Sequence, residues 1–466
     1  MKLRSSSSKT KSNAFSSDAF LRLFQAGTNL VIYRDILKEP VVSHFLSLLE
    51  QLGKEGNPGR GRSRKIAESY ARFFSGLAHL GQEPQEEPVG TVWQNHLLNL
   101  ILDAENPFST SASHGLFPKE KNSLTEQAAL DLRLLKTLHD VDGRQLLQYL
   151  HELPCDMEWE SWEKLPQSLR GGQPGSLRGR FKQQLQQSAD WAVEIKALYD
   201  FYGRTGVGKF GRFRAFHWKP GSDGGVIVPI PDPDPVRLED LIGFEDQKQL
   251  LIHNTEFFLS GIPANNVFVY GDRGTGKSSA IKALLHHFPQ QPLRMLEISR
   301  DDLADLPEVM HTLRGRPEYF IVFVDDLSFE EGETQYKTLK AVLEGSLEAR
   351  PRNVVVYATS NRRHLIKENF SDRVLDNSGE VRPQDTLQEK VSLSDRFGIQ
   401  LVFVAPDQDE YLRIVRSMAQ RRQFSLADEE LTRKALLWVQ RHNTRSGRTA
   451  RQFIDYLGGE LGKPLP

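Results

Sequence analysis

One stretch of the chain has the residue types and the spacing of a phosphate-binding loop. Residues 271–278 read Gly-Asp-Arg-Gly-Thr-Gly-Lys-Ser, which fits the pattern G-x-x-x-x-G-K-[ST]. Glycines let backbone N–H groups curl around phosphates, and a helix that follows such a loop directs its positive end at them. The predicted phosphate-binding residues are Gly271, Asp272, Arg273, Gly274, Thr275, Gly276, Lys277, Ser278 and Ser279.

Two side chains of this loop carry chemistry of their own. The ammonium of Lys277 would contact the β- and γ-phosphates of a nucleotide, and the hydroxyl of Ser278 would ligate Mg²⁺. The loop follows the apolar run 267–270 and precedes a helical stretch at 279–287, which is the strand–loop–helix setting that such a loop needs. This setting argues against a glycine-rich turn that matches by chance, so the sequence predicts ATP and Mg²⁺ as ligands.

A second apolar run ends in a pair of carboxylates. Residues 319–324 predict a buried strand, and Asp325 and Asp326 follow it directly. Asp325 would hold Mg²⁺ through water, and Asp326 is placed to polarise an attacking water as a general base. A solvated acidic pair at the end of a strand is the alternative. The distance of the pair from the phosphate loop along the chain favours the catalytic role.

An earlier segment imitates the phosphate loop without completing it. Residues 203–209 resemble its first positions, but Phe210 replaces the hydroxyl and no apolar strand precedes them, so no nucleotide site is predicted there. Basic and aromatic residues interleave over 204–218 and could stack on a nucleic-acid single strand. Their alternation favours a half-buried strand instead. A further basic segment, 57–65, is predicted to be an exposed loop.

The elements that must position the phosphate loop and the acidic pair lie in the second half of the chain. Four prolines between residues 229 and 235 enforce an extended linker, after which short apolar runs alternate with helical stretches, as in a parallel sheet with crossover helices. The predicted organisation is a disordered tail (1–17), a mainly α-helical N-terminal region (18–228), a proline-rich linker (229–236), an α/β nucleotide-binding domain (237–405) and a helical lid (406–466).

With these motifs, residues 236–461 resemble the AAA+ P-loop ATPases, and four further segments fit that resemblance. It implies an α/β core with a parallel five-stranded sheet, a helical lid, ATP hydrolysis and a homo-oligomer that acts on a protein client. It also implies that Leu241, Ile242 and Gly243 contact the adenine. By the same resemblance Asn361, after the apolar run 354–358, orients the lytic water or reads the γ-phosphate.

The resemblance also assigns arginines. It implies that Arg396, in residues 393–398, reaches the γ-phosphate of a neighbouring subunit, with Arg373 as the rival. It implies that Arg451, at the start of a lid helix, contacts the γ-phosphate, with Arg448 second. Residues 324–330, 359–365 and 446–451 more particularly resemble a bacterial AAA+ group that is classed as a domain of unknown function.

One departure from the AAA+ pattern concerns the acidic pair. The family usually carries Asp-Glu there, whereas this chain has Asp326 in second place, one methylene shorter. Slow hydrolysis is one consequence to expect, unless Glu330 or Glu331 assists. A protein that binds tightly and turns over slowly would act as a nucleotide-gated switch.

Bulk composition narrows the remaining choices. At 466 residues the chain is long enough for more than one core, and 60 Lys+Arg against 61 Asp+Glu leave no overall field to attract nucleic acid. The single Cys155 excludes an internal disulfide and a multi-cysteine metal site. No secretory h-region and no run of bilayer length is present, so a cytoplasmic protein without membrane insertion is expected.

Three functions stay open on the sequence. The first is an oligomeric ATPase that remodels or loads an unidentified protein client, and the second is a DNA-associated factor similar to loader-type ATPases. The third is a non-catalytic scaffold, against which the intact Lys277, Ser278 and Asp325 argue.

Overall fold

A computed structural model describes most of the chain, in two compact units. The described residues are 16–56, 58–84, 87–115, 117–118, 122–152, 158–169, 175–221, 224–289, 291–329, 335–344, 350–362 and 393–462. The units comprise residues 1–212 and 213–466. Most of the predicted tail and Cys155 lie outside the described residues.

The first unit is built from helices, as predicted for the N-terminal region. They are α1 (Ser17–Thr28), α2 (Pro40–Gly53), α3 (Arg60–Gln82), α4 (Val92–Leu102), α5 (Pro107–His114), α6 (Ser123–His139), α7 (Gly143–Glu152), α8 (Leu177–Gln187), α9 (Ile195–Thr205) and α10 (Gly208–Arg212). Short 3₁₀ turns at Arg34–Lys38, Trp162–Lys164 and Trp191–Glu194 connect some of them.

The expectation of an exposed basic loop over 57–65 is wrong for residues 60–65, which begin α3. Arg62 explains the difference. Its guanidinium donates to the backbone carbonyl of Gln51 at 2.9 Å and to that of Gly56 at 2.9 Å, at the end of α2 and just after it. These bonds tie the first turn of α3 to the preceding helix, so a run of basic residues becomes helical.

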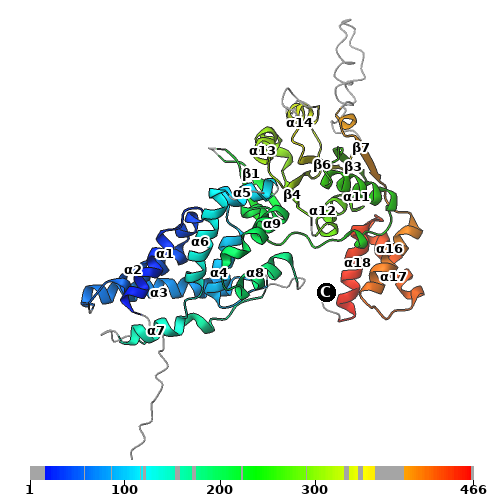
Figure 1. The fold of residues 1–466 in the computed structure, drawn as a ribbon. Coiled ribbons are helices and arrows are strands. Elements are labelled where there is room, and N and C mark those ends of the chain that lie inside the picture. Colours follow the sequence, from blue (N-terminus) through cyan, green and yellow to red (C-terminus); the bar gives the residue numbers. More distant parts are fainter. Residues whose placement is uncertain are drawn as a thin grey trace, which may run out of the picture. The chain divides into compact units, whose positions relative to one another are not determined.

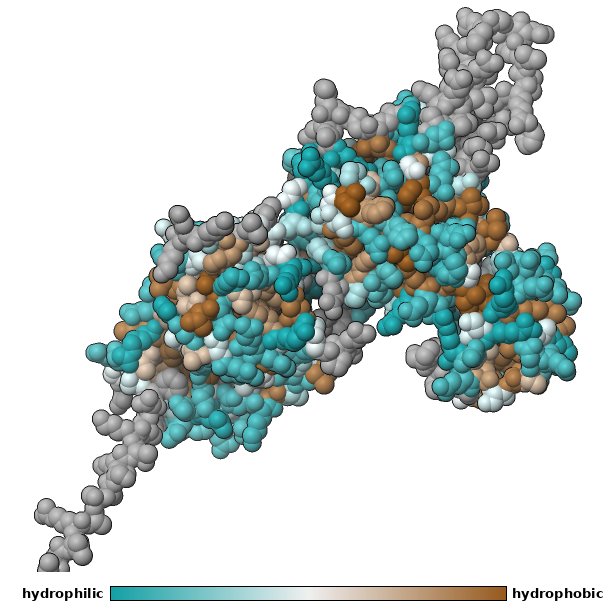
Figure 2. All heavy atoms as spheres, turned by 45° about the vertical axis from the view of Figure 1, so that its right-hand side comes forward, coloured by the Kyte–Doolittle hydropathy of each residue, from teal (hydrophilic) through white to brown (hydrophobic). Residues whose placement is uncertain are grey.

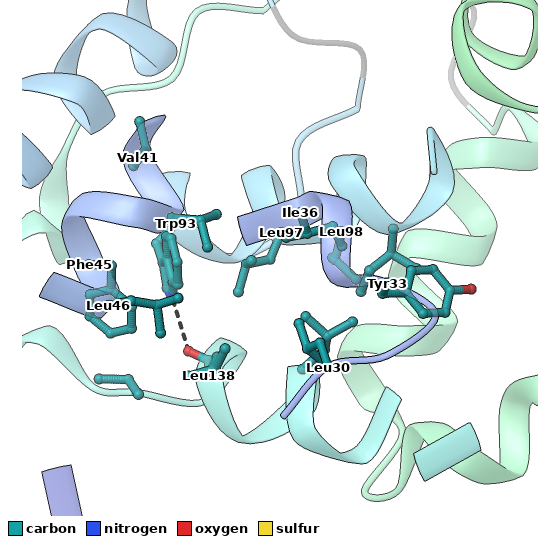
Figure 3. Close-up of a cluster of buried hydrophobic side chains, with 14 of the residues drawn as sticks. Leu30, Tyr33, Ile36, Val41, Phe45, Leu46, Trp93, Leu97, Leu98 and Leu138 are labelled. Carbon is teal, nitrogen blue, oxygen red and sulfur yellow. Dashed lines mark hydrogen bonds between the residues drawn. The ribbon is translucent and has the colours of Figure 1, made fainter. Parts of the chain in front are cut away.

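Large aromatic side chains fill the core of the first unit (Figure 3). Phe45 of α2 packs against Trp93 of α4 with ring centroids 4.5 Å apart, and Phe73 of α3 meets Trp162 at 5.1 Å. The indole N–H of Trp93 donates to the carbonyl of Leu138 at 2.9 Å, so the ring is buried without an unsatisfied polar group. This core draws only on residues of the first unit.

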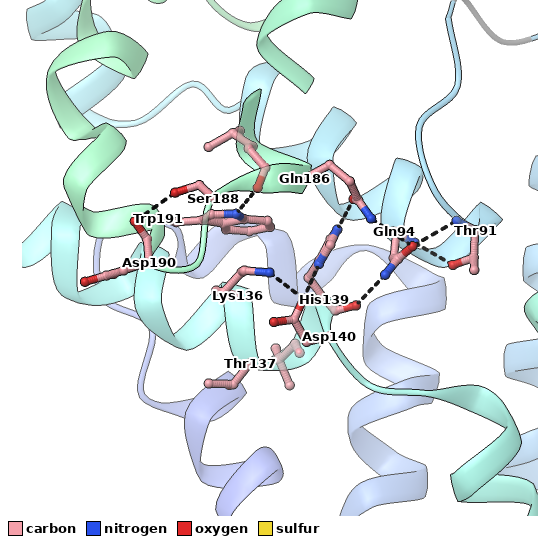
Figure 4. Close-up of polar contacts among 12 residues, drawn as sticks. Thr91, Gln94, Lys136, Thr137, His139, Asp140, Gln186, Ser188, Asp190 and Trp191 are labelled. Atoms are coloured by element: carbon pink, nitrogen blue, oxygen red, sulfur yellow. Dashed lines mark hydrogen bonds and ion pairs between the residues drawn. The ribbon is translucent and has the colours of Figure 1, made fainter. Parts of the chain in front are cut away.

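A buried histidine links α6 to α8 in the same unit (Figure 4). His139 is 1% exposed, and its ring nitrogens lie 2.8 Å from a carboxylate oxygen of Asp140 and 2.9 Å from the side-chain oxygen of Gln186. Lys136 also donates to Asp140, at 2.6 Å. These bonds satisfy the polar atoms that the packing of the helices buries.

The second unit contains a seven-stranded sheet in the order β2-β1-β4-β5-β6-β3-β7 (Figure 1). The strands are β1 (Ala215–Lys219), β2 (Val226–Ile230), β3 (Val267–Gly271), β4 (Leu293–Glu297), β5 (Tyr319–Val324), β6 (Val354–Ser360) and β7 (Ile399–Phe403). All neighbouring strands run parallel except β1 and β2. The predicted fold class is confirmed, but the sheet has seven strands and not five.

The two extra strands come from residues that the sequence assigned to the helical region and the linker. β1 pairs in parallel with β4, and β2 pairs with β1 alone. Pro229 and Ile230, the first residues of the predicted linker, therefore belong to β2. An edge strand tolerates a proline because the missing N–H costs no ladder hydrogen bond on its open side.

Helices surround the sheet and form the lid. Those of the α/β part are α11 (Glu245–Leu259), α12 (Lys277–His287), α13 (Leu306–Leu313) and α14 (Gln335–Glu344), and those of the lid are α16 (Gln408–Arg421), α17 (Asp428–His442) and α18 (Gly447–Glu460). The lid helices share a small core around Tyr411, Val415 and Leu457.

The face of the molecule that Figure 2 shows is largely hydrophilic. None of the helices in the described ranges combines the length and apolar character of a membrane span.

Candidate nucleotide-binding site

The predicted phosphate loop connects β3 to α12 and needs its glycines. Gly271 has φ +138° and Gly276, directly before α12, has φ +100°, both in the region that favours glycine. A Cβ atom on Gly271 would lie 1.9 Å from the carbonyl oxygen of Phe403. The last residue of β3 can therefore turn into the loop only without a side chain, which keeps the loop close to β7.

Lys277 lies at the start of α12 and curls back over the loop. Its ammonium donates to the carbonyls of Gly271 and Asp272 at 3.0 and 2.7 Å and to the side-chain oxygen of Asn361 at 3.0 Å. Burial lowers the pKa of Lys277, and the nearby carboxylates of Asp326, Asp272 and Asp325 counteract this only in part. A desolvated cation is thus held beside the loop.

The acidic pair lies at the carboxyl end of β5, beside the loop. The hydroxyl of Ser278 donates to a carboxylate oxygen of Asp325 at 2.6 Å, which brings together the two predicted Mg²⁺ ligands. Thr359, in β6, also donates to this oxygen. Its Oγ1 in turn accepts from the backbone N–H of Asp326 at 2.9 Å, and Asp326 has φ +50°. Thr359 thus helps to hold Asp326 in an unusual backbone conformation.

Sequence reasoning missed Thr359, although a signal for it exists. The residue lies near the end of β6, the strand that pairs with β5, and it directly follows Ala358, which lies opposite Val324. The carboxyl ends of neighbouring parallel strands meet at one edge of a sheet, so the residue after Ala358 must lie beside Asp325.

Asn361 connects the two halves of the site. Its side-chain oxygen accepts from Lys277, and its amide nitrogen donates to a carboxylate oxygen of Asp326. The residue predicted to orient a lytic water therefore touches both the cation of the loop and the predicted general base.

The lid reaches the phosphate loop through the first turn of α18. Ser446 caps this helix, and the backbone N–H of Arg448 donates to the carbonyl of Gly274 at 3.2 Å. Arg448 and Arg451 both line the cavity described next. Arg448 has this backbone contact in addition, although the sequence ranked it second.

A cavity of about 650 Å³ lies between the loop, the acidic pair and the lid. Among the predicted residues, it is lined by Leu241, Ile242, Arg273, Gly274, Thr275, Gly276, Lys277, Ser278, Ser279, Asp325, Asp326, Asn361, Arg448 and Arg451. Its size suits a ligand as large as a nucleotide. Its lining includes the hydroxyl of Ser278 and the carboxylates of Asp325 and Asp326. Such hard oxygen atoms are the ligands that Mg²⁺ prefers.

Three of the residues predicted to contact the adenine or the phosphates do not line this cavity. Gly243 has φ +84° and forms the turn before α11. Gly271 closes β3, and the carboxylate of Asp272 accepts from the backbone N–H of Ala405 at 2.7 Å. The positions of these residues support the loop and its contact with the segment that follows β7, which is a structural role.

Apolar residues at one end of the cavity escaped the sequence analysis. They are Phe244, Pro406, Ile414 and Met418. Phe244 has φ +59° and stacks on Phe403 with ring centroids 4.4 Å apart. Ile414 and Met418 lie four residues apart on one face of α16, and only the docking of the lid shows that this face meets Leu241 and Ile242.

The predicted finger arginine lies elsewhere. Arg396 ends the short 3₁₀ turn Ser394–Arg396, is exposed and does not line the cavity. Its rival Arg373 and the two assisting glutamates proposed from the sequence, Glu330 and Glu331, lie outside the described residues.

The basic and aromatic cluster at 204–218 does not form a stacking surface. Phe210, Phe216 and Trp218 are at most 4% exposed. Residues 208–212 are helical, and 215–219 form the half-buried strand that the alternation favoured. The cluster therefore gives no structural support to nucleic-acid binding.

Within the described part of the chain, no group of three or more His, Cys, Asp or Glu could hold a metal ion.

A comparison with models of protein families identifies the family of this chain. A family model described as "Protein of unknown function (DUF815)" matches residues 211–461, just over half of the chain. The chain belongs to this family. The match to DUF815 begins just before β1, so the two extra strands lie inside the matched region together with the core and the lid.

The comparisons with other proteins reach less far. No curated protein matches the chain. Among solved structures, it is similar to the RuvB Holliday junction branch migration motor of Thermotoga maritima, at 16% identity and a TM-score of 0.30, over 48% of this chain and 72% of that one. It is also similar to the FIGL-1 AAA domain in complex with ADP, at 16% identity and 0.30, over 43% and 66%. These likenesses assign no role to any residue of the site.

Proposed function

We propose that this DUF815 protein is an AAA+-type ATPase that binds ATP with Mg²⁺ in the 650 Å³ cavity and hydrolyses it. One observation carries the proposal. A continuous network of hydrogen bonds joins Lys277, Asn361 and Asp326 on one side and Ser278 and Asp325 on the other, on the floor of a nucleotide-sized cavity.

The network has the parts that a triphosphate requires. Phosphate oxygens would replace the backbone carbonyls that Lys277 now contacts, because their negative charge stabilises a buried ammonium better than carbonyl dipoles do. Ser278 and Asp325 would hold Mg²⁺, which supplies positive charge to the β- and γ-phosphate oxygens. Leu241, Ile242, Ile414 and Met418 would enclose the base.

The hydrolytic residues are proposed on the same geometry. Asp326 would take a hydrogen bond from the attacking water, and Asn361 would hold Asp326 and the γ-phosphate in register. Arg451 and Arg448 would contact the γ-phosphate from the lid. The exposed Arg396 would act in a homo-oligomer, where it would reach the site of a second copy.

The output of the cycle is proposed to be a conformational change on a protein partner. The hydrogen bond from Arg448 to Gly274 joins the lid to the loop that holds the phosphates, so loss of the γ-phosphate would alter the position of the lid. The short side chain of Asp326 favours slow turnover, and a nucleotide-gated switch is therefore the second candidate.

Release of phosphate by the purified chain tests the proposal. We expect Mg²⁺-dependent release from ATP that falls to background in Lys277→Ala, because the ammonium is the fixed cation of the loop. A Lys337→Ala variant serves as the control, since it removes an exposed lysine of the same unit that does not line the cavity. Release equal in wild type and Lys277→Ala would show that this site does not hydrolyse ATP.

A further inference from the structure

The acidic pair also lines a second cavity. It has a volume of about 520 Å³ and is lined by His217 and Trp218 of β1, Glu297 of β4, and Asp325 and Asp326. The acidic pair therefore forms part of the wall of two cavities, one facing the nucleotide and one facing the extra strands. Figure 1 shows β1 beside β4 at this edge of the sheet.

The position of Glu297 follows from the pairing of β4 with β5. Glu297 lies opposite Phe323, and Phe323 precedes Asp325 by two residues. The backbone N–H of Ile298 donates to the carbonyl of Phe323 at 3.0 Å. Both strands end at the same edge of the sheet, so the carboxylate of Glu297 lies at the side of the acidic pair. Its side chain is 34% exposed, which leaves it accessible to water from the cavity.

The extra strand β1 places an imidazole beside this carboxylate. His217 lies opposite Glu297 in the parallel pairing, and its Nδ1 is 3.6 Å from a carboxylate oxygen of Glu297, just beyond hydrogen-bond distance. The neighbouring Trp218 is fixed because its indole N–H donates to Asp305 at 2.9 Å.

We propose that Glu297 is a proton relay of the hydrolytic centre, which accepts from Asp326 the proton that Asp326 takes from the attacking water. The proposal rests on the ATPase function proposed above. Asp326 lines both cavities, whereas Glu297 lines the second cavity but not the nucleotide cavity. Glu297 is therefore placed to receive a proton from Asp326 through the second cavity without touching the attacking water.

The step balances without another reactant. The oxygen of the water bonds to the γ-phosphorus, the bond from that phosphorus to the bridging oxygen breaks, and ADP leaves with the electron pair. The proton of the water goes to the carboxylate of Asp326, from there through the second cavity to the carboxylate of Glu297, and then to solvent. Asn361 keeps Asp326 in place.

Glu297→Gln in the full chain tests the proposal. We expect kcat for ATP to fall about 10-fold, less than the loss typical of a general base because Asp326 still takes the proton from the water, while the Kd of a fluorescent ATP analogue stays within about twofold of wild type. His217→Gln should lower kcat less, since His217 only lies beside Glu297. Asp301→Asn is the matched control, because this exposed carboxylate lies near the end of β4 but does not line the second cavity.

A double variant separates catalysis from a structural role. Glu297→Gln combined with Asp326→Asn should lose little more activity than the more damaging single variant, because both carboxylates lie on one proton path. If Glu297→Gln turns over like wild type, or if it loses nucleotide binding and thermal stability together with kcat, the role of Glu297 is overturned. A wild-type chain that does not hydrolyse ATP overturns the proposed function itself, which is a different outcome.

Discussion

Asp325 and Asp326 are adjacent in the chain, but their side chains have different hydrogen-bond partners. Asp325 accepts hydrogen bonds from two hydroxyls, those of Ser278 and Thr359, and so points toward the phosphate loop. Asp326, turned by its positive φ, faces Asn361. The first is placed to bind an ion and the second to act on water.

This difference gives a prediction for Asp326→Asn. The amide keeps the shape of the side chain but is a poor base, so hydrolysis should fall about 100-fold while ATP binding is retained. Phosphate release and analogue binding measured on the same sample check this. Asp325→Asn is the comparison, since it should weaken the dependence of binding on Mg²⁺. Equal loss of ATP binding in both variants would contradict the division of tasks.

A second prediction concerns acid stability and belongs to the first unit. Burial raises the pKa of Asp140, but hydrogen bonds from His139 and Lys136 outweigh burial and lower that pKa below its ordinary value. A carboxyl group with a lowered pKa stabilises the folded state above its ordinary pKa, and this contribution is lost as the pH falls through the lowered value.

The measurement is urea unfolding of wild type and Asp140→Asn from about pH 7 to about pH 2. The variant should be less stable at neutral pH, and the two curves should converge in acid, where Asp140 is protonated in both states. A difference that stays constant with pH would exclude the charge of Asp140 as the cause.

At the scale of single residues, the motifs predicted the polar half of the cavity well. Spacing alone predicted that Lys277, Ser278 and Asp325 lie together at one site, because binding a triphosphate with Mg²⁺ requires fixed residue types at fixed intervals. Phe244 and Met418 could not be predicted in this way, since apolar residues in a helix or turn have no signature that separates lining a cavity from filling a core.

At the scale of elements, the close approach of β3 and β7 shapes the phosphate loop. Gly271→Ala would combine a positive φ with a clash against the carbonyl of Phe403, and we expect a loss of about 3 kcal/mol of folding stability. Gly315→Ala is the control, because Gly315 also has a positive φ of +72° but no atom within 4 Å of the added Cβ. It should cost about 1 kcal/mol. Chemical denaturation of both variants checks the difference, and equal losses would show that the contact with β7 is unimportant.

The order of strands and helices after residue 237 was predictable, because short apolar runs alternate with helical periodicity there. β2 was not predictable, because the alternating prolines indicate an extended linker. Nothing in the sequence around Pro229 indicates that this segment pairs with β1 as an edge strand. Similarly, the sequence could not show that Arg62 ties the basic segment to α2. In both places a tertiary contact overrides the local pattern.

At the scale of the whole molecule, the two units have separate cores. The core of the first unit ends at Val207, and those of the sheet and the lid draw on later residues. We therefore expect residues 213–466 alone to fold and to bind ATP with an affinity within about threefold of the full chain, since the cavity lies wholly in this unit. Circular dichroism and analogue titration check this, and an unfolded or non-binding fragment would show that the first unit is needed for the site.

The central claim is that one triphosphate with its magnesium binds between the phosphate loop and the acidic pair. Calorimetric titration of the full chain with a non-hydrolysable ATP analogue tests it most directly. We predict one site per chain that depends on Mg²⁺ and is lost in Lys277→Ala. Absence of heat at millimolar nucleotide and Mg²⁺, or the same affinity in Lys277→Ala, would contradict the account.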